Sequence, residues 1–230
     1  MQSVSIHSGV TKIGSSAFQN CSNLKRVYIS DIAAWCEMDF SDVNSCPLIY
    51  GAELYLNGEP VKDIVIPDGV TRIPDFAFNN CTSLTSVVIP DSVTEIGKGA
   101  FYECTGLTEI TIPGSVKEIG ELAFCDCSGL KKVILQNGVS RILQAAFVRC
   151  TSLTTIVIPE SVYKIISSAL AFESNSTTVY FGGNETAWEI ISGAAWGQPG
   201  EEPQFATVLY YSETETPGCW HYVDGVPTPW

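Results

Sequence analysis

Cysteine is the residue type in this chain that could take part in the most kinds of chemistry, and the chain contains nine cysteines. Cys81, Cys104, Cys127 and Cys150 follow one another at intervals of 23 residues. Thiols spaced in this way could be buried as small apolar residues, could form disulfides between repeats, or could bind a metal. A constant interval is typical of a core position, and free cysteine is among the most buried residue types. Because parallel Cβ vectors suit a disulfide poorly, we expect stacked thiols.

The remaining cysteines offer weaker candidates. Cys36 and Cys46 lie outside the regular repeat and are the pair best placed to form a disulfide, and the sequence leaves both states open. The spacing Cys125-x-Cys127 resembles half of a zinc site, but Cys127 is a repeat cysteine and Cys125 stands where another repeat has Asn79. We therefore expect no metal and no cofactor.

The chain has few of the residue patterns that are typical of catalytic sites. The chain has two histidines, His7 and His221, and it lacks the Gly-x-Ser-x-Gly, His-Glu-x-x-His and phosphate-loop patterns. The acidic pair Glu201 and Glu202 falls in a Gly- and Pro-rich segment, where nothing would desolvate a carboxyl group and raise its pKa. The sequence predicts a protein that is not an enzyme.

The interval of 23 residues belongs to an internal repeat, which predicts the fold. Each repeat carries Ala-Phe, then Cys, then Leu, then an alternating apolar segment that usually ends at Pro, and closes with Val-x-x-Ile. Six copies can be recognised, the last of them degenerate. The alternating segments are Val87-x-Ile89, Ile110-x-Ile112, Val133-x-Leu135 and Ile156-x-Ile158.

Alternation with period two predicts a short, half-buried strand, and Pro ends it because it has no N–H to donate. One repeat cannot bury its own apolar side, so successive strands must stack in parallel at about 4.8 Å. Identical core residues then form ladders, the most prominent of them aromatic. Its expected members are Phe18, Phe78, Phe101, Phe124 and Phe147.

The repeat Ala-Phe-x-x-Cys-x-x-Leu-x-x-Ile-x-Ile-Pro-x-x-Val-x-x-Ile-Gly resembles the BspA-like leucine-rich repeat family, most closely at residues 80–90. The resemblance covers most of residues 4–170. It implies a leucine-rich-repeat solenoid from a bacterial surface protein, some members of which bind host matrix or other bacteria. Ligands differ between members, so the resemblance implies no particular binding residues.

Two segments interrupt or follow the array. Residues 31–63 are predicted to be a non-repeat insertion, with a helical turn capped by Asp31 and a hairpin with an Asn57-Gly58 turn. A similar sequence segment near Asn184 and Trp188 predicts a second capping helix. The expected organisation is N-terminal repeats (1–30), insertion (31–63), main repeats (64–181), capping helix and linker (182–204) and a β tail (205–230).

Solvent-facing strand positions are the first candidate binding site. They reflect either β-propensity on a pleated surface or a docking surface for a protein partner. These positions are Arg26, Tyr28, Ser86, Val88, Glu109, Thr111, Lys132, Ile134, Thr155 and Val157.

The aromatic tail is the second candidate. Its rings either cap the last strand or stack on sugars as a glycan patch. The residues concerned are Tyr210, Tyr211, Trp220, Tyr222 and Trp230.

Charge narrows the class of partner. The net charge is −13, and residues 165–230 contain eight acidic residues and no Lys or Arg. Such a surface repels phosphate backbones and anionic lipids, and no window is apolar enough to cross a membrane. Residues 1–4 lead directly into repeat sequence, so we expect an export signal to have been lost by truncation.

These observations predict an extracellular or cell-surface interaction module whose partner is a host or bacterial surface protein or glycan. Adhesion through the solenoid surface is the leading hypothesis. Polysaccharide binding by the tail and a passive spacer role are the alternatives.

Overall fold

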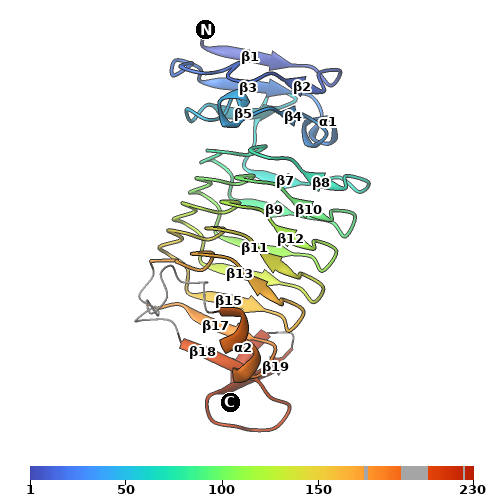
Figure 1. The fold of residues 1–230 in the computed structure, drawn as a ribbon. Coiled ribbons are helices and arrows are strands. Elements are labelled where there is room, and N and C mark those ends of the chain that lie inside the picture. Colours follow the sequence, from blue (N-terminus) through green and yellow to red (C-terminus); the bar gives the residue numbers. More distant parts are fainter. Residues whose placement is uncertain (174–175, 193–206, 225) are drawn as a thin grey trace.

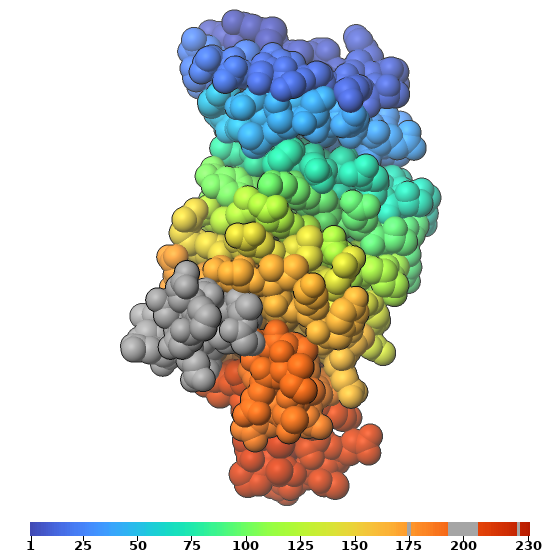
Figure 2. Space-filling view, viewed as in Figure 1, coloured from blue at the N-terminus to red at the C-terminus, as the bar shows by residue number. Residues whose placement is uncertain are grey.

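In the computed structural model the chain forms an elongated β-solenoid with the two termini at opposite ends (Figure 1). The structure describes residues 1–173, 176–192, 207–224 and 226–230. Most of the predicted linker, with Glu201 and Glu202, lies outside these residues. Figure 2 shows the successive turns of the solenoid, which we call coils, as layers in chain order. The predicted parallel-strand solenoid is confirmed.

One face of the solenoid carries the predicted strands, and we call it the strand face. Within each sheet of this face, neighbouring strands pair in parallel and in register along the repeats, so that Ile110 on β11 lies opposite Val133 on β13, one repeat later. The strands are β1 (Ser3–Ile6), β3 (Arg26–Ile29), β5 (Glu53–Leu56), β7 (Asp63–Val65), β9 (Ser86–Val88), β11 (Glu109–Ile112), β13 (Lys132–Leu135), β15 (Thr155–Ile158), β17 (Thr178–Phe181) and β18 (Thr207–Tyr211).

A second ladder is built by the Val-x-x-Ile segments, which the sequence analysis did not assign to strands. Each supplies two residues, the second an inward Ile or Phe and the first a polar side chain. The outward charges pair across the ladder, as in Arg141 to Glu118 at 2.6 Å, although exposed pairs of this kind stabilise a fold little. The strands are β2 (Lys12–Ile13), β4 (Asp39–Phe40), β8 (Arg72–Ile73), β10 (Glu95–Ile96), β12 (Glu118–Ile119), β14 (Arg141–Ile142) and β16 (Lys164–Ile165).

A tight double turn joins the two ladders and forms a third face, which we call the turn face. It contains the Ala-Phe pair, and in each regular coil the N–H of Phe donates to the carbonyl of Ala in the next coil, for example Phe101 to Ala123 at 2.8 Å. The residue before Ala-Phe and the residue before Cys both have positive φ, as do Gly99 and Glu103. The turn therefore uses left-handed backbone twice in each coil.

The core is the predicted stack of phenyl rings. Consecutive rings from Phe78 through Phe101 and Phe124 to Phe147 have centroids 5.2 to 5.4 Å apart and planes within 14° of parallel. All four are fully buried. Phe18 lies across the irregular segment from this stack and is 9% exposed.

The irregular segment, residues 31–63, contains the predicted helix and hairpin. Helix α1 (Ile32–Cys36) is capped by Asp31, whose Oδ1 accepts the Ala33 N–H at 2.8 Å. Strand β5 turns at Asn57-Gly58 and pairs antiparallel with β6 (Glu59–Pro60). The segment nevertheless does more than interrupt the array, because β4 pairs in parallel with β2 and continues the second ladder. The expectation of a wholly non-repeat piece is corrected: residues 31–50 complete a longer coil.

Trp35 joins this longer coil to the regular ones. Its indole is 1% exposed, and Nε1 donates to the Ala77 carbonyl at 2.9 Å. In the regular coils the corresponding Ala carbonyl accepts a Phe backbone N–H, such as Phe78 to Ala100. A side chain thus supplies the hydrogen bond that a preceding Phe would otherwise make, as expected for a buried carbonyl that must be paired.

The C-terminal end is covered in a similar way. Helix α2 (Glu185–Ser192) places Trp188 against Phe181, with ring centroids 5.2 Å apart, and Asn184 caps it by accepting the Ala187 N–H. Strand β18 pairs with β17, so the tail extends the ladder. Strand β19 (Cys219–Val223) follows β18 and pairs antiparallel with β20 (Val226–Pro229). Helix α2, with its buried Trp188, packs against β16, the last strand of the second ladder, while the strand face continues through β18 and β19.

The phenyl stack yields a first prediction. Phe101→Ala would leave a cavity between two rings and should lower the free energy of unfolding by about 3 to 5 kcal/mol. Denaturant melts of this variant and of Asp68→Ala, an exposed position, measure the difference. A midpoint shift equal to that of Asp68→Ala would contradict the stacked core.

Trp35 yields a second prediction. Trp35→Phe keeps an aromatic ring but leaves the Ala77 carbonyl buried without its donor, which should cost about 1 to 3 kcal/mol. Trp230→Phe is the matched control, because its Nε1 also donates to a carbonyl, that of Ser212 at 3.1 Å, but at an exposed site. Equal melting temperatures for the two variants would contradict the role of Trp35.

Candidate functional site

The predicted binding residues share the strand face but not one sheet. Arg26 and Tyr28 lie on β3, in the N-terminal sheet β1-β3-β5-β6. Ser86 and Val88 lie on β9, which pairs only with β7, and the other predicted residues lie on the sheet that begins at β11. The strand face is therefore interrupted twice, between β5 and β7 and between β9 and β11.

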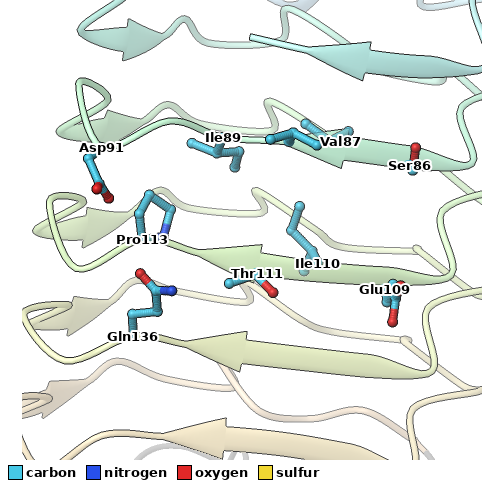
Figure 3. Close-up of a pocket in the computed structure, with 10 residues that line it drawn as sticks. Ser86, Val87, Ile89, Asp91, Glu109, Ile110, Thr111, Pro113 and Gln136 are labelled. Atoms are coloured by element: carbon cyan, nitrogen blue, oxygen red, sulfur yellow. The ribbon is translucent and has the colours of Figure 1, made fainter. Parts of the chain in front are cut away.

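A cleft opens at the second interruption, with a volume of about 380 Å³ (Figure 3). Ser86 and Val88 from one coil and Glu109 and Thr111 from the next line it. Figure 3 shows Asp91, Pro113 and Gln136 along the opposite end of the same hollow. Four of the predicted binding residues are thus brought together.

The two coils that contain β9 and β11 separate only on the strand face. On the second ladder β8 and β10 remain paired, and in the core the rings of Phe78 and Phe101 are 5.4 Å apart. On the turn face the Phe78 N–H still donates to the Ala100 carbonyl at 2.8 Å. The edges of β9 and β11 that face each other are therefore not paired, and their N–H and C=O groups are free to bond to water or to a partner.

The surroundings of the cleft combine exposed apolar side chains with acidic groups. Val88 is 55% exposed, and Val65, its partner on β7, is 68% exposed. Asp63 on β7 accepts hydrogen bonds from Ser86 at 2.6 Å and Thr85 at 2.9 Å. These hydroxyl donors lower the pKa of Asp63, so its carboxylate stays ionised. Asp91 and Glu109 add two more acidic groups at the cleft.

One predicted residue of this surface is corrected. Val157 was expected to face solvent, but it is 2% exposed. It lies between Ile134 and Tyr180 on the neighbouring strands, and Ile134 and Thr155 are half-buried. The accessible part of the strand face is therefore centred on β9 and β11.

The prediction for the aromatic tail is also corrected. Trp220 is 1% exposed, and its Nε1 donates to the Phe181 carbonyl at 2.9 Å, so its faces are not available to a sugar. Tyr211 and Tyr222 pack against its ring at 5.3 and 4.9 Å. Tyr210 is half-buried, and burial raises its pKa.

Trp230 stacks on His221 at 3.6 Å. The rings of the tail thus pack mainly on one another. Tyr222, 53% exposed, presents the most open of them.

The repeat cysteines form the predicted stack. The thiols of Cys104 and Cys127 donate to the carbonyls of Phe78 and Phe101 one coil earlier, both at 3.1 Å. All nine cysteines are free, so the disulfide considered for Cys36 and Cys46 is not formed. Instead, Cys46 lies close enough to Cys81 for the two thiols to interact electrostatically.

A second hollow, of about 670 Å³, lies on the turn face where the longer coil meets the regular ones. Sequence reasoning missed it, although a signal was present. Phe76 and Leu122 occupy the left-handed position before Ala-Phe, where the other repeats carry Ser16, Gly99, Ala145 or Ser168. Bulky apolar residues at a position that favours small ones indicate a local function.

The parallel ladder with a repeated Leu, Ile and Phe core defines a leucine-rich-repeat solenoid. The BspA-type leucine-rich repeat region matches residues 1–46 and 50–178 in six copies. The chain therefore belongs to the BspA-type leucine-rich repeat family. No curated protein matches the chain.

Solved structures of bacterial proteins resemble the chain. A leucine-rich-repeat protein from Eubacterium ventriosum has 15% identity and a TM-score of 0.52, over 90% of this chain and 81% of its own, a likeness of fold. A leucine-rich cell surface protein from Faecalibacterium prausnitzii has 27% identity and a TM-score of 0.40, over 78% of this chain. The chain spans 60% of that protein's length. Treponema pallidum TpLRR has 26% identity and a TM-score of 0.46, over 79% of this chain and 73% of its own.

Within the described ranges, no helix has the length and apolar character needed to cross a membrane.

The thiols give a third prediction. Burial raises the pKa of Cys81 and of Cys46 to about 12, so at pH 8 both remain protonated and unreactive toward a thiol reagent. Only Cys21 and Cys219, which are half-exposed, should react rapidly with Ellman's reagent in the native protein. The same protein in guanidinium should release all nine equivalents and serves as the control. Rapid reaction of more than two thiols in the native state would contradict this assignment.

Proposed function

We propose that the chain is a non-catalytic interaction module of the bacterial cell surface that binds a protein partner through its strand face. The observation that carries this proposal is the interruption between β9 and β11, which leaves unpaired strand edges beside the exposed Val88. Polar groups of a partner can bond to the backbone groups that line the cleft, while an apolar side chain of the partner contacts Val88. The surrounding carboxylates favour a partner that carries positive charge.

Adhesion to host matrix or to other cells is the biological role that we infer from this surface. The ladders hold the coils in a fixed arrangement, so little conformational entropy is lost on binding. The family membership supports a surface location, and a structural neighbour is described as a leucine-rich cell surface protein.

Two alternatives remain as proposals. Binding of a polysaccharide by the tail would rest on Tyr222 and Tyr211, because Trp220 is buried. A passive spacer would use neither surface. Neither alternative accounts for the exposed Val88 at an interrupted sheet.

A fourth prediction tests these proposals. Val88→Lys combined with Thr111→Lys places two cations at the cleft, at exposed positions where the fold should be unaffected. Binding to arrayed extracellular-matrix proteins and to intact bacterial cells should weaken at least tenfold. Thr71→Lys combined with Thr82→Lys adds the same charge at exposed positions away from the strand face and is the matched control.

Other outcomes point to the alternatives. Binding to arrayed glycans that is lost in Tyr222→Ala but kept in the cleft variant would favour the polysaccharide function. Failure of the wild-type chain to bind any arrayed protein, cell or glycan would favour the spacer.

A further inference from the structure

We infer that the hollow on the turn face is a second binding site, which takes a peptide segment of a protein partner with a bulky apolar side chain next to Lys or Arg. The site is separate from the strand face and does not depend on the function proposed for it. We call it the turn-face groove and define it by Val43, Ile49, Phe76, Leu122 and the acidic residues Asp42, Asp75 and Glu103.

The groove exists because the longer coil does not stack regularly on the coil that follows. Val43 and Ile49 from the longer coil form one wall, and Phe76 from the first regular coil begins the other. The two walls are tied by a hydrogen bond from Asn80 Nδ2 to the Ile49 carbonyl at 3.1 Å and, beneath them, by the bond from Trp35 to Ala77. The volume of about 670 Å³ falls within the range of ligand pockets, about 300 to 1,000 Å³.

The apolar part of the groove is built on left-handed backbone. Phe76 and Leu122 have φ of 61° and 58°, and Gly99 lies between them at the same position of the intervening coil. A Cβ added to Gly99 would meet the Phe76 ring at 3.0 Å, so the ring lies directly over this glycine. The Phe76 ring fills the space above Gly99, and together with Leu122 it gives the groove an apolar lining. A bulky apolar side chain from a partner can pack against this lining, in the hollow between it and the wall of Val43 and Ile49.

The charged part of the groove is acidic. The hydroxyl of Ser15 and the backbone N–H of Ser16 donate to Asp42, and these bonds lower its pKa, so it remains a carboxylate. Asp75 accepts the backbone N–H of Lys98 at 2.9 Å.

Lys98 is the cation among the lining residues, and its Nζ is paired with Glu121 at 2.9 Å. The groove therefore contains three acidic residues, Asp42, Asp75 and Glu103. Its cation, Lys98, is already paired with Glu121. Charge complementarity selects Lys or Arg beside the apolar anchor.

The apolar lining favours a peptide over a sugar. A carbohydrate requires an open aromatic platform, whereas Phe76 is partly buried against the core. Tyr102 is partly buried in the wall, and this burial, together with the nearby Asp126 carboxylate, raises the pKa of its hydroxyl. Side chains that are partly buried in this way lose little freedom when a partner binds.

The test uses variants that remove the apolar walls and keep the backbone. Phe76→Asn combined with Leu122→Asn suits the fold, because Asn accepts left-handed backbone and already occupies it at Asn20 and Asn80. Ala145→Asn is the matched control, since it has the same left-handed position in a coil outside the groove. Both variants should still unfold in a single cooperative transition, so that a loss of binding is not a loss of the fold.

Binding is measured with a displayed library of random twelve-residue peptides, selected on the full chain and counter-selected on the double variant. The enriched peptides should carry an aromatic or aliphatic residue next to Lys or Arg. By fluorescence anisotropy they should bind the wild type and Ala145→Asn equally, and the double variant at least tenfold more weakly. Glu103→Gln should weaken binding and reduce its dependence on salt.

The proposal is overturned if no peptide is enriched over the double variant, or if the enriched peptides lack a basic residue. It is also overturned if Ala145→Asn loses binding to the same extent, or if an arrayed glycan competes for the groove. A cleft variant on the strand face should leave peptide binding unchanged, so failure here is distinguishable from failure of the strand-face function.

Discussion

Everything in this structure depends on each coil pairing its backbone with the next one. The Phe to Ala hydrogen bonds on the turn face, the two parallel ladders and the phenyl stack all recur once per coil, and each requires the same residue at the same place 23 positions later. No coil buries its own apolar side, so the stability of any one depends on its neighbours. The strict repeat of Phe, Cys and Ile follows from this constraint.

A ladder of this kind leaves unpaired groups wherever it stops or changes period. In this chain, indole side chains pair two of these groups. Trp35 donates to the Ala77 carbonyl where the longer coil meets the regular ones. Trp220 donates to the Phe181 carbonyl near the C-terminal end. Each indole buries a large apolar surface and pairs one carbonyl at the same time. Tryptophan is suited to both positions for that reason.

Both candidate binding surfaces lie where the regularity fails. The cleft between β9 and β11 and the turn-face groove mark two places where neighbouring coils pair on some faces and part on another. Regular stretches of the solenoid fill their own surface with paired backbone and close side chains. Irregular ones leave strand edges, exposed Val88 and the apolar walls at Phe76 and Leu122. Function in such a protein is expected at interruptions, because that is where surface remains to be covered.

The sequence alone determined the solenoid, its parallel strands, the phenyl and thiol ladders, and the two helices that begin after Asp31 and Asn184, because each depends on local periodicity or on a cap close by in the chain. Tertiary structure decided the rest. Val157 and Trp220 are buried by contacts with strands and rings distant in sequence, and a strand pattern cannot reveal which of its outward positions is covered. The pairing of β4 with β2 inside a segment without the repeat pattern depends on backbone hydrogen bonds, which carry no sequence signature. The gap between β9 and β11 likewise has no sequence signature, because the residues of both coils match the repeat as well as those of coils that pair fully.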